Sequence, residues 1–174
     1  DREGSMFSFM QSDYTTVGEG VAVPGTGISL QNRGANFSLD PASDNCLAGG
    51  KRSYHTIIPG FLLRDGAAVG PFGVMGAFMQ PQGQTEVLVN TLDYHMNPQE
   101  ALDAPRIQWI GGRRLELERE AGEAIADELR AMGHEVTVVD DRISMGRGQI
   151  IWRGEDGVYT AGTEPRCDGA VAAW

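Results

Sequence analysis

The chain has 174 residues, of which 41% are hydrophobic and 22% charged, a balance that predicts one folded domain or a piece of a larger one. Asp and Glu number 24 against 14 Lys and Arg, which gives a formal net charge of −10. A surface this acidic repels phosphate backbones and anionic lipids, so we expect no nucleic-acid partner and no membrane partner.

The opening residues do not look like the start of a folding unit. Residues 1–5 are typical of the end of one strand, a turn and the start of the next, so we expect the chain to begin inside a longer protein. No apolar run approaches the roughly 18 residues that a membrane-spanning helix needs. Cys46 and Cys167 lie far apart without a CxxC pair, and no two histidines have metal-ligand spacing. The sequence therefore predicts neither a disulfide framework nor a metal site, and it leaves the bacterial cytoplasm and the periplasm both open.

Short apolar stretches alternate with turn residues over the first half of the chain, a pattern typical of strands. In residues 5–11 the side chains alternate between two faces, and we expect this strand to belong to the core. Pro24-Gly25 predicts a type II turn, a polar loop covers about 38–52, and Arg64–Ala67 predicts a hairpin turn. The expected strands are residues 5–11, 21–23, 28–30, 57–63 (buried, interrupted by Pro59) and 69–75.

The hydrophobic period then changes to that of a helix. Residues 82–95 predict an amphipathic helix, and Asn97 with Pro98 predicts the cap and first position of a second helix ending at Asp103. A third helix is expected over 120–132. Its apolar stripe is Ala121, Ile125, Leu129 and Met132. Strands follow at 135–139, 149–153 and 158–161. Strands joined by hairpins, then helices, then strands favour an α+β fold with an antiparallel sheet over a doubly wound parallel one.

Several sequence stretches carry a family resemblance when they are taken together. They are residues 25–34 with 36–38, 50–56, 75–80, 93–106 and 164–170. In order and spacing they resemble the small subunit of the gamma-glutamyltranspeptidase family, which belongs to the N-terminal-nucleophile (Ntn) hydrolases. The resemblance implies that residues 1–174 are the C-terminal, small-subunit part of such an enzyme, and that they form part of a four-layer α-β-β-α sandwich.

The chemistry that the resemblance implies is amide hydrolysis or acyl transfer through a Thr that self-cleavage frees at a new N-terminus. In the family this Thr lies about seven residues before the position of Asp1, and its α-amine acts as the general base. The 174 residues contain no such Thr, so we expect them to be inactive alone. The implied partners are the N-terminal large subunit of the same precursor and a small-molecule amide substrate, with no metal or organic cofactor.

Family position assigns the oxyanion hole to the backbone N–H groups of Gly76 and Ala77, where the family usually has Gly-Gly. The alternative is that Gly76 only relieves crowding between a strand and a helix. Ser12 matches a Thr whose hydroxyl supports the nucleophile in the family, although an ordinary strand-end serine is equally compatible with the sequence.

The expected substrate-binding residues depart from the family pattern. They are Tyr14, Arg33, Asn36, His55 and Thr56. Asn36 replaces a family Asp that pairs with the substrate ammonium. Arg33 adds a positive charge to the same wall of the implied substrate pocket, and His55-Thr56 replaces the family's Ser-Ser. These changes suit an acyl group with a terminal carboxylate and no amine, a trend shared by glutaryl/cephalosporin acylases and oxamate amidohydrolases. As alternatives, Arg33 pairs with a surface acid, and His55 is a hydrogen-bonded wall residue rather than an acid or base.

Two further arginines are interpreted as structural. We expect Arg106 and Arg166 to tie loop carbonyls together through a buried guanidinium fork. As half of a sandwich, the isolated chain is expected to expose an apolar sheet face and to form dimers or higher aggregates. A non-catalytic homologue that binds a ligand or partner remains the alternative function.

Overall fold

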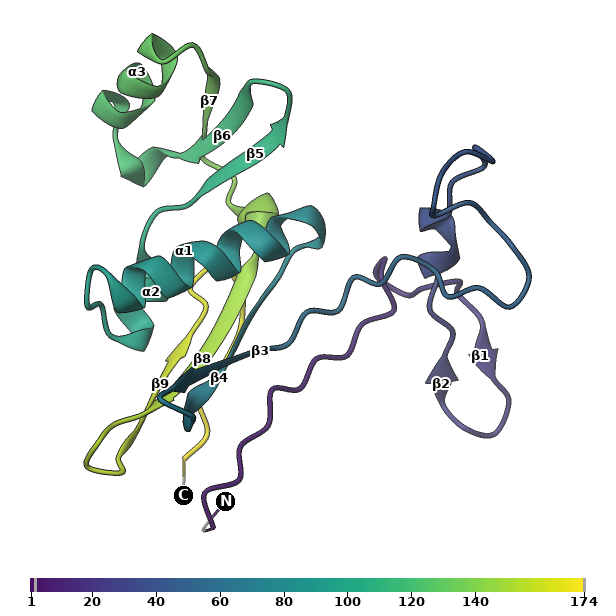
Figure 1. The fold of residues 1–174 in the computed structure, drawn as a ribbon, viewed down its shortest axis with the longest axis horizontal. Helices are drawn as coiled ribbons and strands as arrows, with labels where there is room; N and C mark the ends of the chain where they lie inside the picture. The colour runs from purple at the N-terminus through teal and green to yellow at the C-terminus, as the bar shows by residue number, and fades with distance from the viewer. Residues whose placement is uncertain (2, 174) are drawn as a thin grey trace. The chain divides into compact units, whose positions relative to one another are not determined.

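The computed structural model describes residues 1 and 3–173, which form two compact units (Figure 1). The sheet unit consists of Asp1–Ser8 and Pro59–Trp174, and the loop unit of Phe9–Ile58.

The centre of the sheet unit is a four-stranded antiparallel sheet in the order β3-β4-β8-β9. Its strands are β3 (Gly60–Arg64), β4 (Ala67–Met75), β8 (Arg147–Arg153) and β9 (Tyr159–Thr163). Helices α1 (Gln80–Leu92) and α2 (Pro98–Asp103) cover one face (Figure 1). The core between them consists of Phe72, Val74, Val87, Ala101, Leu102, Ile150 and Trp152. The predicted α+β class with an antiparallel sheet is confirmed.

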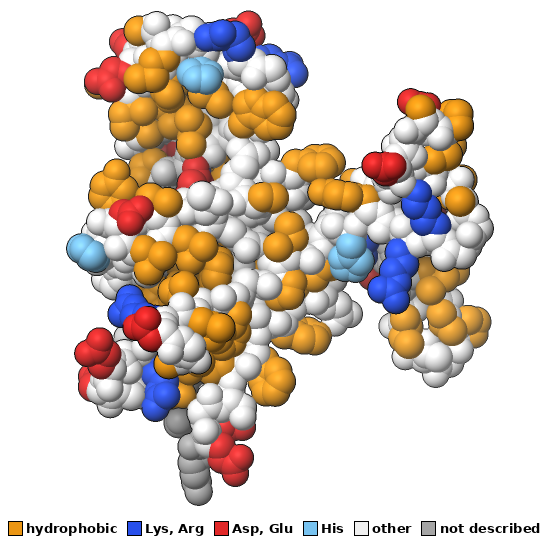
Figure 2. Space-filling model, in the orientation of Figure 1, with side chains coloured by type: hydrophobic (Ala, Val, Ile, Leu, Met, Phe, Trp, Pro, Cys, Tyr) orange, Lys and Arg blue, Asp and Glu red, His pale blue; other side chains and the backbone are white. Residues whose placement is uncertain are grey.

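The opposite face of this sheet exposes several apolar side chains beside polar ones such as Gln149 and Arg153. Alternate strand residues point to opposite faces, so the neighbours of the core residues lie on this side. Phe61, Leu63, Met75 and Ile151 are accordingly exposed. Figure 2 shows further hydrophobic side chains, mixed with both signs of charge, on the side that carries α1. The sheet thus exposes apolar side chains, as expected, whereas a large apolar face and the aggregation it should cause remain predictions.

The predicted hairpin turn at Arg64–Ala67 and the predicted start of the second helix are both confirmed. Asp65 and Gly66 have positive φ values of 51° and 80°, as a tight hairpin turn between β3 and β4 requires. At α2, the Asn97 side chain accepts hydrogen bonds from the N–H groups of Gln99 and Glu100, and Glu100 accepts one from Asn97 N–H at 2.8 Å. This reciprocal arrangement is a capping box.

Two strand predictions were wrong in detail. Residues 57–63 were expected to form a buried strand, but β3 begins only at Gly60, and Phe61 and Leu63 are exposed. Pro59 has no N–H to give to a ladder, and β3 is an edge strand with one neighbour. Residues 5–11 alternate between two faces but form no strand, and Phe7 is 83% exposed rather than part of the core. An alternating pattern of side chains does not by itself provide a neighbouring strand to pair with.

A smaller sheet was not predicted as a unit. Strands β5 (Ile107–Gly111) and β6 (Arg114–Glu118) pair antiparallel, and β6 pairs parallel with β7 (Glu135–Val139), reached through α3 (Glu123–Ala131). The expected strand 135–139 matches β7, but the hairpin over 107–118 was missed.

The packing face of α3 also differs from the predicted stripe. Ala126 is fully buried, while Ile125 is 48% and Met132 67% exposed. Successive helix residues lie about 100° apart, so a face centred on Ala126 turns Ile125 away from the sheet.

The loop unit contains a two-stranded hairpin, β1 (Ala22–Val23) and β2 (Ile28–Ser29), and the 3₁₀ helix η1 (Arg33–Asn36). Thr26 N–H donates to the carbonyl of Val23 at 3.2 Å, and Gly25 has φ 77°. Both observations fit the predicted type II turn at Pro24-Gly25. Across both units, no helix within the described residues has the length and apolarity to span a membrane.

Candidate functional site

The most unusual residue of the loop unit is Arg33, a guanidinium that is only 4% exposed. Its Nε donates to Thr56 Oγ1 at 2.9 Å, and one Nη donates to the carbonyl of Ser12 at 2.8 Å. The other Nη lies 3.4 Å from Gln31 Oε1, which also accepts from the Arg33 backbone N–H at 2.6 Å. These contacts bring together segments that are more than 20 residues apart in sequence.

All of these acceptors are neutral. Among the residues that the structure describes, no carboxylate forms an ion pair with Arg33, so the alternative of a surface acid is not what the chain shows. A buried charge is unfavourable unless an opposite charge compensates it. The Arg33 side chain is therefore suited to receive an anion.

Tyr14 and Asn36 form a second contact in the same unit. The Tyr14 hydroxyl donates to Asn36 Oδ1 at 2.9 Å, and the Tyr14 backbone N–H donates to Ser12 Oγ at 2.9 Å. Tyr14 has φ 81°, a conformation that is uncommon for a residue other than glycine. Asn36 Nδ2 is buried and has no hydrogen-bond partner within the described part of the chain. The structure thus places an unused donor and an uncompensated cation on one 3₁₀ helix.

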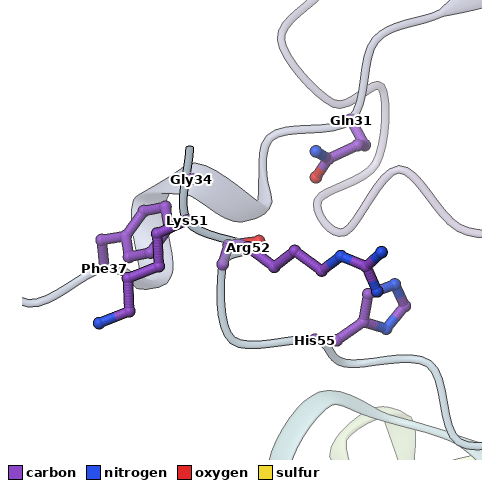
Figure 3. A pocket seen from close by; sticks show the side chains of 7 residues that line it. Gln31, Gly34, Phe37, Lys51, Arg52 and His55 are labelled. Atoms are coloured by element: carbon purple, nitrogen blue, oxygen red, sulfur yellow. The ribbon is translucent and has the colours of Figure 1, made fainter. Parts of the chain in front are cut away.

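An open pocket of about 380 Å³ borders this group (Figure 3). Its lining is Gln31, Gly34, Phe37, Lys51, Arg52, Ser53 and His55. The Arg52 side chain extends toward the His55 ring, and Gln31 connects the pocket to Arg33 (Figure 3). His55 is exposed, and its Nδ1 accepts from Ile57 N–H at 3.1 Å. This contact is compatible with a hydrogen-bonded residue in the pocket wall, and the role of His55 stays a prediction.

The loop unit therefore joins Ser12, Tyr14, Arg33, Asn36 and Thr56 by hydrogen bonds, with His55 in the adjoining pocket wall. Their role as substrate-binding residues stays a prediction. Sequence reasoning missed Gln31, although it lies two residues before Arg33 inside one of the family-like stretches.

The expected oxyanion donors lie in the sheet unit, where β4 passes into the 3₁₀ helix η2 (Ala77–Met79) and then α1. Gly76 has φ 155° and Ala77 φ 51°. A Cβ on Gly76 would lie 2.9 Å from the Gly146 Cα, just before β8, and 3.3 Å from the Met79 Cβ in η2, so Gly76 stands in a crowded place. Neither backbone N–H donates to an acceptor among the described residues. Crowding and an anion-binding role are compatible at this junction.

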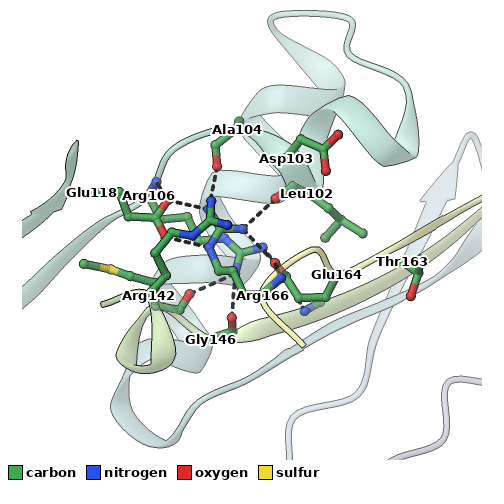
Figure 4. A network of polar contacts seen from close by, with 12 residues as sticks. Leu102, Asp103, Ala104, Arg106, Glu118, Arg142, Gly146, Thr163, Glu164 and Arg166 are labelled. Carbon is green, nitrogen blue, oxygen red and sulfur yellow. Dashed lines mark hydrogen bonds and ion pairs between the residues drawn. The ribbon is translucent and has the colours of Figure 1, made fainter. Parts of the chain in front are cut away.

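A cluster of four buried charges lies elsewhere in the sheet unit (Figure 4). Arg106 pairs with Glu164 at 2.8 Å, Arg166 pairs with Glu164 at 2.7 Å, and Arg166 also pairs with Glu118. All four side chains are almost fully buried. Burial alone would raise the pKa of Glu118, but hydrogen bonds from Arg166 and from the Arg106 backbone hold it below its usual value.

The same arginines bind loop carbonyls, as predicted. Arg166 donates to the carbonyls of Leu102 and Ala104 at 2.8 and 3.0 Å. Arg106 donates to those of Met145 and Gly146 at 2.8 and 3.0 Å. The structural interpretation of these two arginines is confirmed.

One buried carboxyl stands beside that cluster without a full set of partners. Burial, the largest effect, raises the pKa of Glu86 to about 7, against the smaller opposing influence of the Ile107 N–H that binds its Oε1 at 3.0 Å. Its Oε2 is buried and has no hydrogen-bond partner within the described residues. No group of three His, Cys, Asp or Glu side chains in the described part of the chain has the arrangement to hold a metal ion.

Comparison with known proteins assigns the class. The model of the family "Gamma-glutamyltranspeptidase" matches residues 1–174, and the chain belongs to this family. The fold agrees: the chain is similar to gamma-glutamyltranspeptidase from Pseudomonas nitroreducens, with a TM-score of 0.86 and 25% identity over 100% of this chain and 96% of that one. The Ntn-hydrolase fold that the resemblance implied is confirmed.

Within the family the chain is similar to proteins of the acylase-like branch. It is 58% identical to cephalosporin acylase from Bacillus halodurans, with a TM-score of 0.90 over 95% of this chain and 31% of that one. It is 38% identical to the glutathione hydrolase-like YwrD proenzyme of Bacillus subtilis, over 98% of this chain, and 37% identical to the oxamate amidohydrolase proenzyme of Klebsiella pneumoniae, over 100%. It spans about a third of the length of both proenzymes.

Proposed function

We propose that the intact protein is an amide hydrolase or acyltransferase of the N-terminal-nucleophile type, and that residues 1–174 are its C-terminal, small-subunit part. The proposed substrate is a small amide whose acyl group ends in a carboxylate and carries no amine beside it. The observation that carries this proposal is the buried guanidinium of Arg33, whose hydrogen-bond acceptors are all neutral. A substrate carboxylate would supply the missing negative charge.

The proposed reaction uses a Thr from a segment before Asp1. Its hydroxyl oxygen attacks the amide carbon while its α-amine takes the hydroxyl proton, and the N–H groups of Gly76 and Ala77 stabilise the oxyanion. The C–N bond then breaks, and the amine leaves with that proton. Water, or an acceptor amine in a transferase, attacks the resulting ester and releases the acyl group, which restores the Thr hydroxyl.

The comparisons support a larger precursor. Both similar proteins at 38% and 37% identity are named proenzymes, and this chain covers 34% of each. The Pseudomonas nitroreducens chain is matched over 96% of its own length, so a separate chain of similar extent exists in that enzyme. We infer that self-cleavage separates the small subunit from a large subunit that covers the exposed apolar sheet face.

The test is mass spectrometry of the full-length gene product, followed by kinetics. We expect two chains, the smaller beginning with Thr about seven residues before Asp1. With the processed enzyme, kcat/KM for glutaryl p-nitroanilide should exceed that for γ-glutamyl p-nitroanilide. An unsplit product without activity would favour a non-catalytic binding protein. A preference for the γ-glutamyl substrate would contradict the assigned acyl specificity.

A further inference from the structure

The Asn36 side chain cannot by itself distinguish a carboxylate from an ammonium group. A primary amide has a carbonyl oxygen that accepts hydrogen bonds and an NH₂ group that donates them. Rotated one way it would bind an ammonium, and rotated the other way a carboxylate. The selectivity of this wall therefore depends on what fixes the amide.

Tyr14 supplies that constraint. Its hydroxyl donates to Asn36 Oδ1 at 2.9 Å, so the amide oxygen is occupied. Asn36 Nδ2, in contrast, is buried and has no partner among the described residues. The backbone of Asn36 is also held, because Asn45 Nδ2 donates to its carbonyl at 2.7 Å. Only the donor half of the amide remains available to a ligand.

The position of Asn36 relative to Arg33 adds a second donor to the same wall. The two residues are the ends of η1, and side chains three positions apart in a 3₁₀ helix lie on the same side. Arg33 has no acceptor group of any kind. An arginine and an amide fixed as a donor would thus present only N–H groups to a ligand.

We propose that Tyr14 is a positioning residue that determines specificity: by holding the Asn36 amide as a donor, it makes this wall bind carboxylates and disfavour ammonium groups. The inference rests on the proposed function, because it assigns a cause to the acyl preference of that same site. The Tyr14 hydroxyl acts through its contact with Asn36. The unusual backbone of Tyr14, with φ 81°, is maintained where it brings the hydroxyl to Asn36.

The experiment is Tyr14→Phe in the intact, processed enzyme, which removes one hydroxyl and keeps the ring. The ratio of kcat/KM for glutaryl over γ-glutamyl p-nitroanilide should fall about tenfold, the size expected for one hydrogen bond. The fall should appear as a higher KM for the glutaryl substrate with kcat unchanged, because the contact acts in binding. Tyr159→Phe is the matched control, since Tyr159 lies on β9 and its hydroxyl has no partner among the described residues.

A double-mutant cycle tests whether the effect passes through the amide. In an Asn36→Ala background, Tyr14→Phe should produce no further fall in the ratio. A second variant, Asn36→Asp, keeps an acceptor for Tyr14 but replaces the offered donor by an oxygen, and it should lower the ratio even if Tyr14→Phe is not processed.

The outcomes separate this inference from the proposed function. A wild-type enzyme that prefers the γ-glutamyl substrate would overturn both. A wild-type preference for glutaryl with an unchanged ratio in Tyr14→Phe, an equal fall in the Asn36→Ala background, or an unmoved ratio in Asn36→Asp would overturn only the role of Tyr14.

Discussion

The buried arginines of the sheet unit and of the loop unit have opposite kinds of partner: carboxylates in the first and neutral oxygens in the second. In the sheet unit, Arg106 and Arg166 meet Glu118 and Glu164, so two positive and two negative charges compensate one another within the chain. In the loop unit, Arg33 is equally buried but is held only by neutral oxygens. We call the first arrangement a closed set, because its charges cancel within the chain. The second is an open site, because its positive charge is left for an anionic ligand to compensate. The comparison therefore distinguishes a structural arginine from one that is proposed to bind a ligand by its partners rather than by its burial.

The largest expected effect comes from opening the closed set. Glu164→Gln leaves Arg106 and Arg166 short of negative charge, so we expect a loss of about 3–5 kcal/mol in the free energy of unfolding. Chemical denaturation of the intact protein measures it. The control is Asp140→Asn, which breaks the exposed pair with Arg119 and should leave stability almost unchanged because solvent screens exposed charges. Similar values for the two variants would contradict the buried network.

A smaller effect on stability is expected at Glu86. This carboxyl lies beside the closed set but forms no ion pair with its arginines. Its pKa is raised from 4.5 to about 7, so the folded state holds the proton more tightly than the unfolded state. The associated stability is complete below pH 4.5 and is lost as the pH rises through 7. Glu86→Gln should therefore match the wild type at pH 4.5 and exceed it at pH 8, by up to about 3 kcal/mol.

Thermal unfolding across this pH range checks the Glu86 prediction. The exposed Glu128→Gln on α3 serves as the control and should show no pH-dependent difference. A Glu86→Gln advantage that is equal at both pH values would mean that lost charge is not its cause.

At the open site, the expected change is in specificity. Asn36→Asp combined with Arg33→Gln gives an ammonium a negative partner and removes the repelling cation, so the double variant should shift toward γ-glutamyl amides. The change in the glutaryl to γ-glutamyl ratio of kcat/KM is expected to be roughly 100-fold. An unchanged ratio would show that Arg33 and Asn36 do not discriminate against the substrate amine.

The smallest effect, and the most direct test of the comparison, is the stability of Arg33→Met. Lost hydrogen bonds are offset by the removal of an uncompensated buried charge, so we expect a change of about 1 kcal/mol. The same substitution at Arg166 should lower stability by about 3–5 kcal/mol. Equal losses in denaturation of the two variants would place Arg33 among the structural arginines.

Local signals predicted those parts of the fold that depend on local contacts. Asn97 and Pro98 marked the start of α2, and Pro24-Gly25 marked a turn, because caps and turns are made by neighbouring residues. The prediction of a strand at residues 5–11 was wrong for the opposite reason. A strand needs a hydrogen-bonded partner, and the alternation of its own side chains does not show whether one is present. The rotation of α3 onto Ala126 likewise depends on the sheet beneath it.

The candidate site was predictable only as a set of positions. The family resemblance pointed to Arg33, Asn36 and Thr56, but it could not show that Arg33 Nε meets Thr56 across 23 residues of sequence. It also could not show that no carboxylate accompanies Arg33, since that depends on the packing of the whole unit. Gln31 was missed because its contact with Arg33 has no separate sequence signal.

The close approach of Gly76 to Gly146 places the proposed oxyanion donors against the core of the sheet unit. A Cβ on Gly146 would lie 3.0 Å from the carbonyl of Met75, and one on Gly76 would lie 2.9 Å from the Gly146 Cα. The carbonyl of Gly146 is in turn fixed by Arg106 at 3.0 Å. This packing connects the buried ion cluster to the strand end that bears the proposed oxyanion donors. With Gly76 and Ala77 as the proposed donors, we expect turnover of the intact enzyme to fall on warming before the chain unfolds, because loosening this packing displaces the donors.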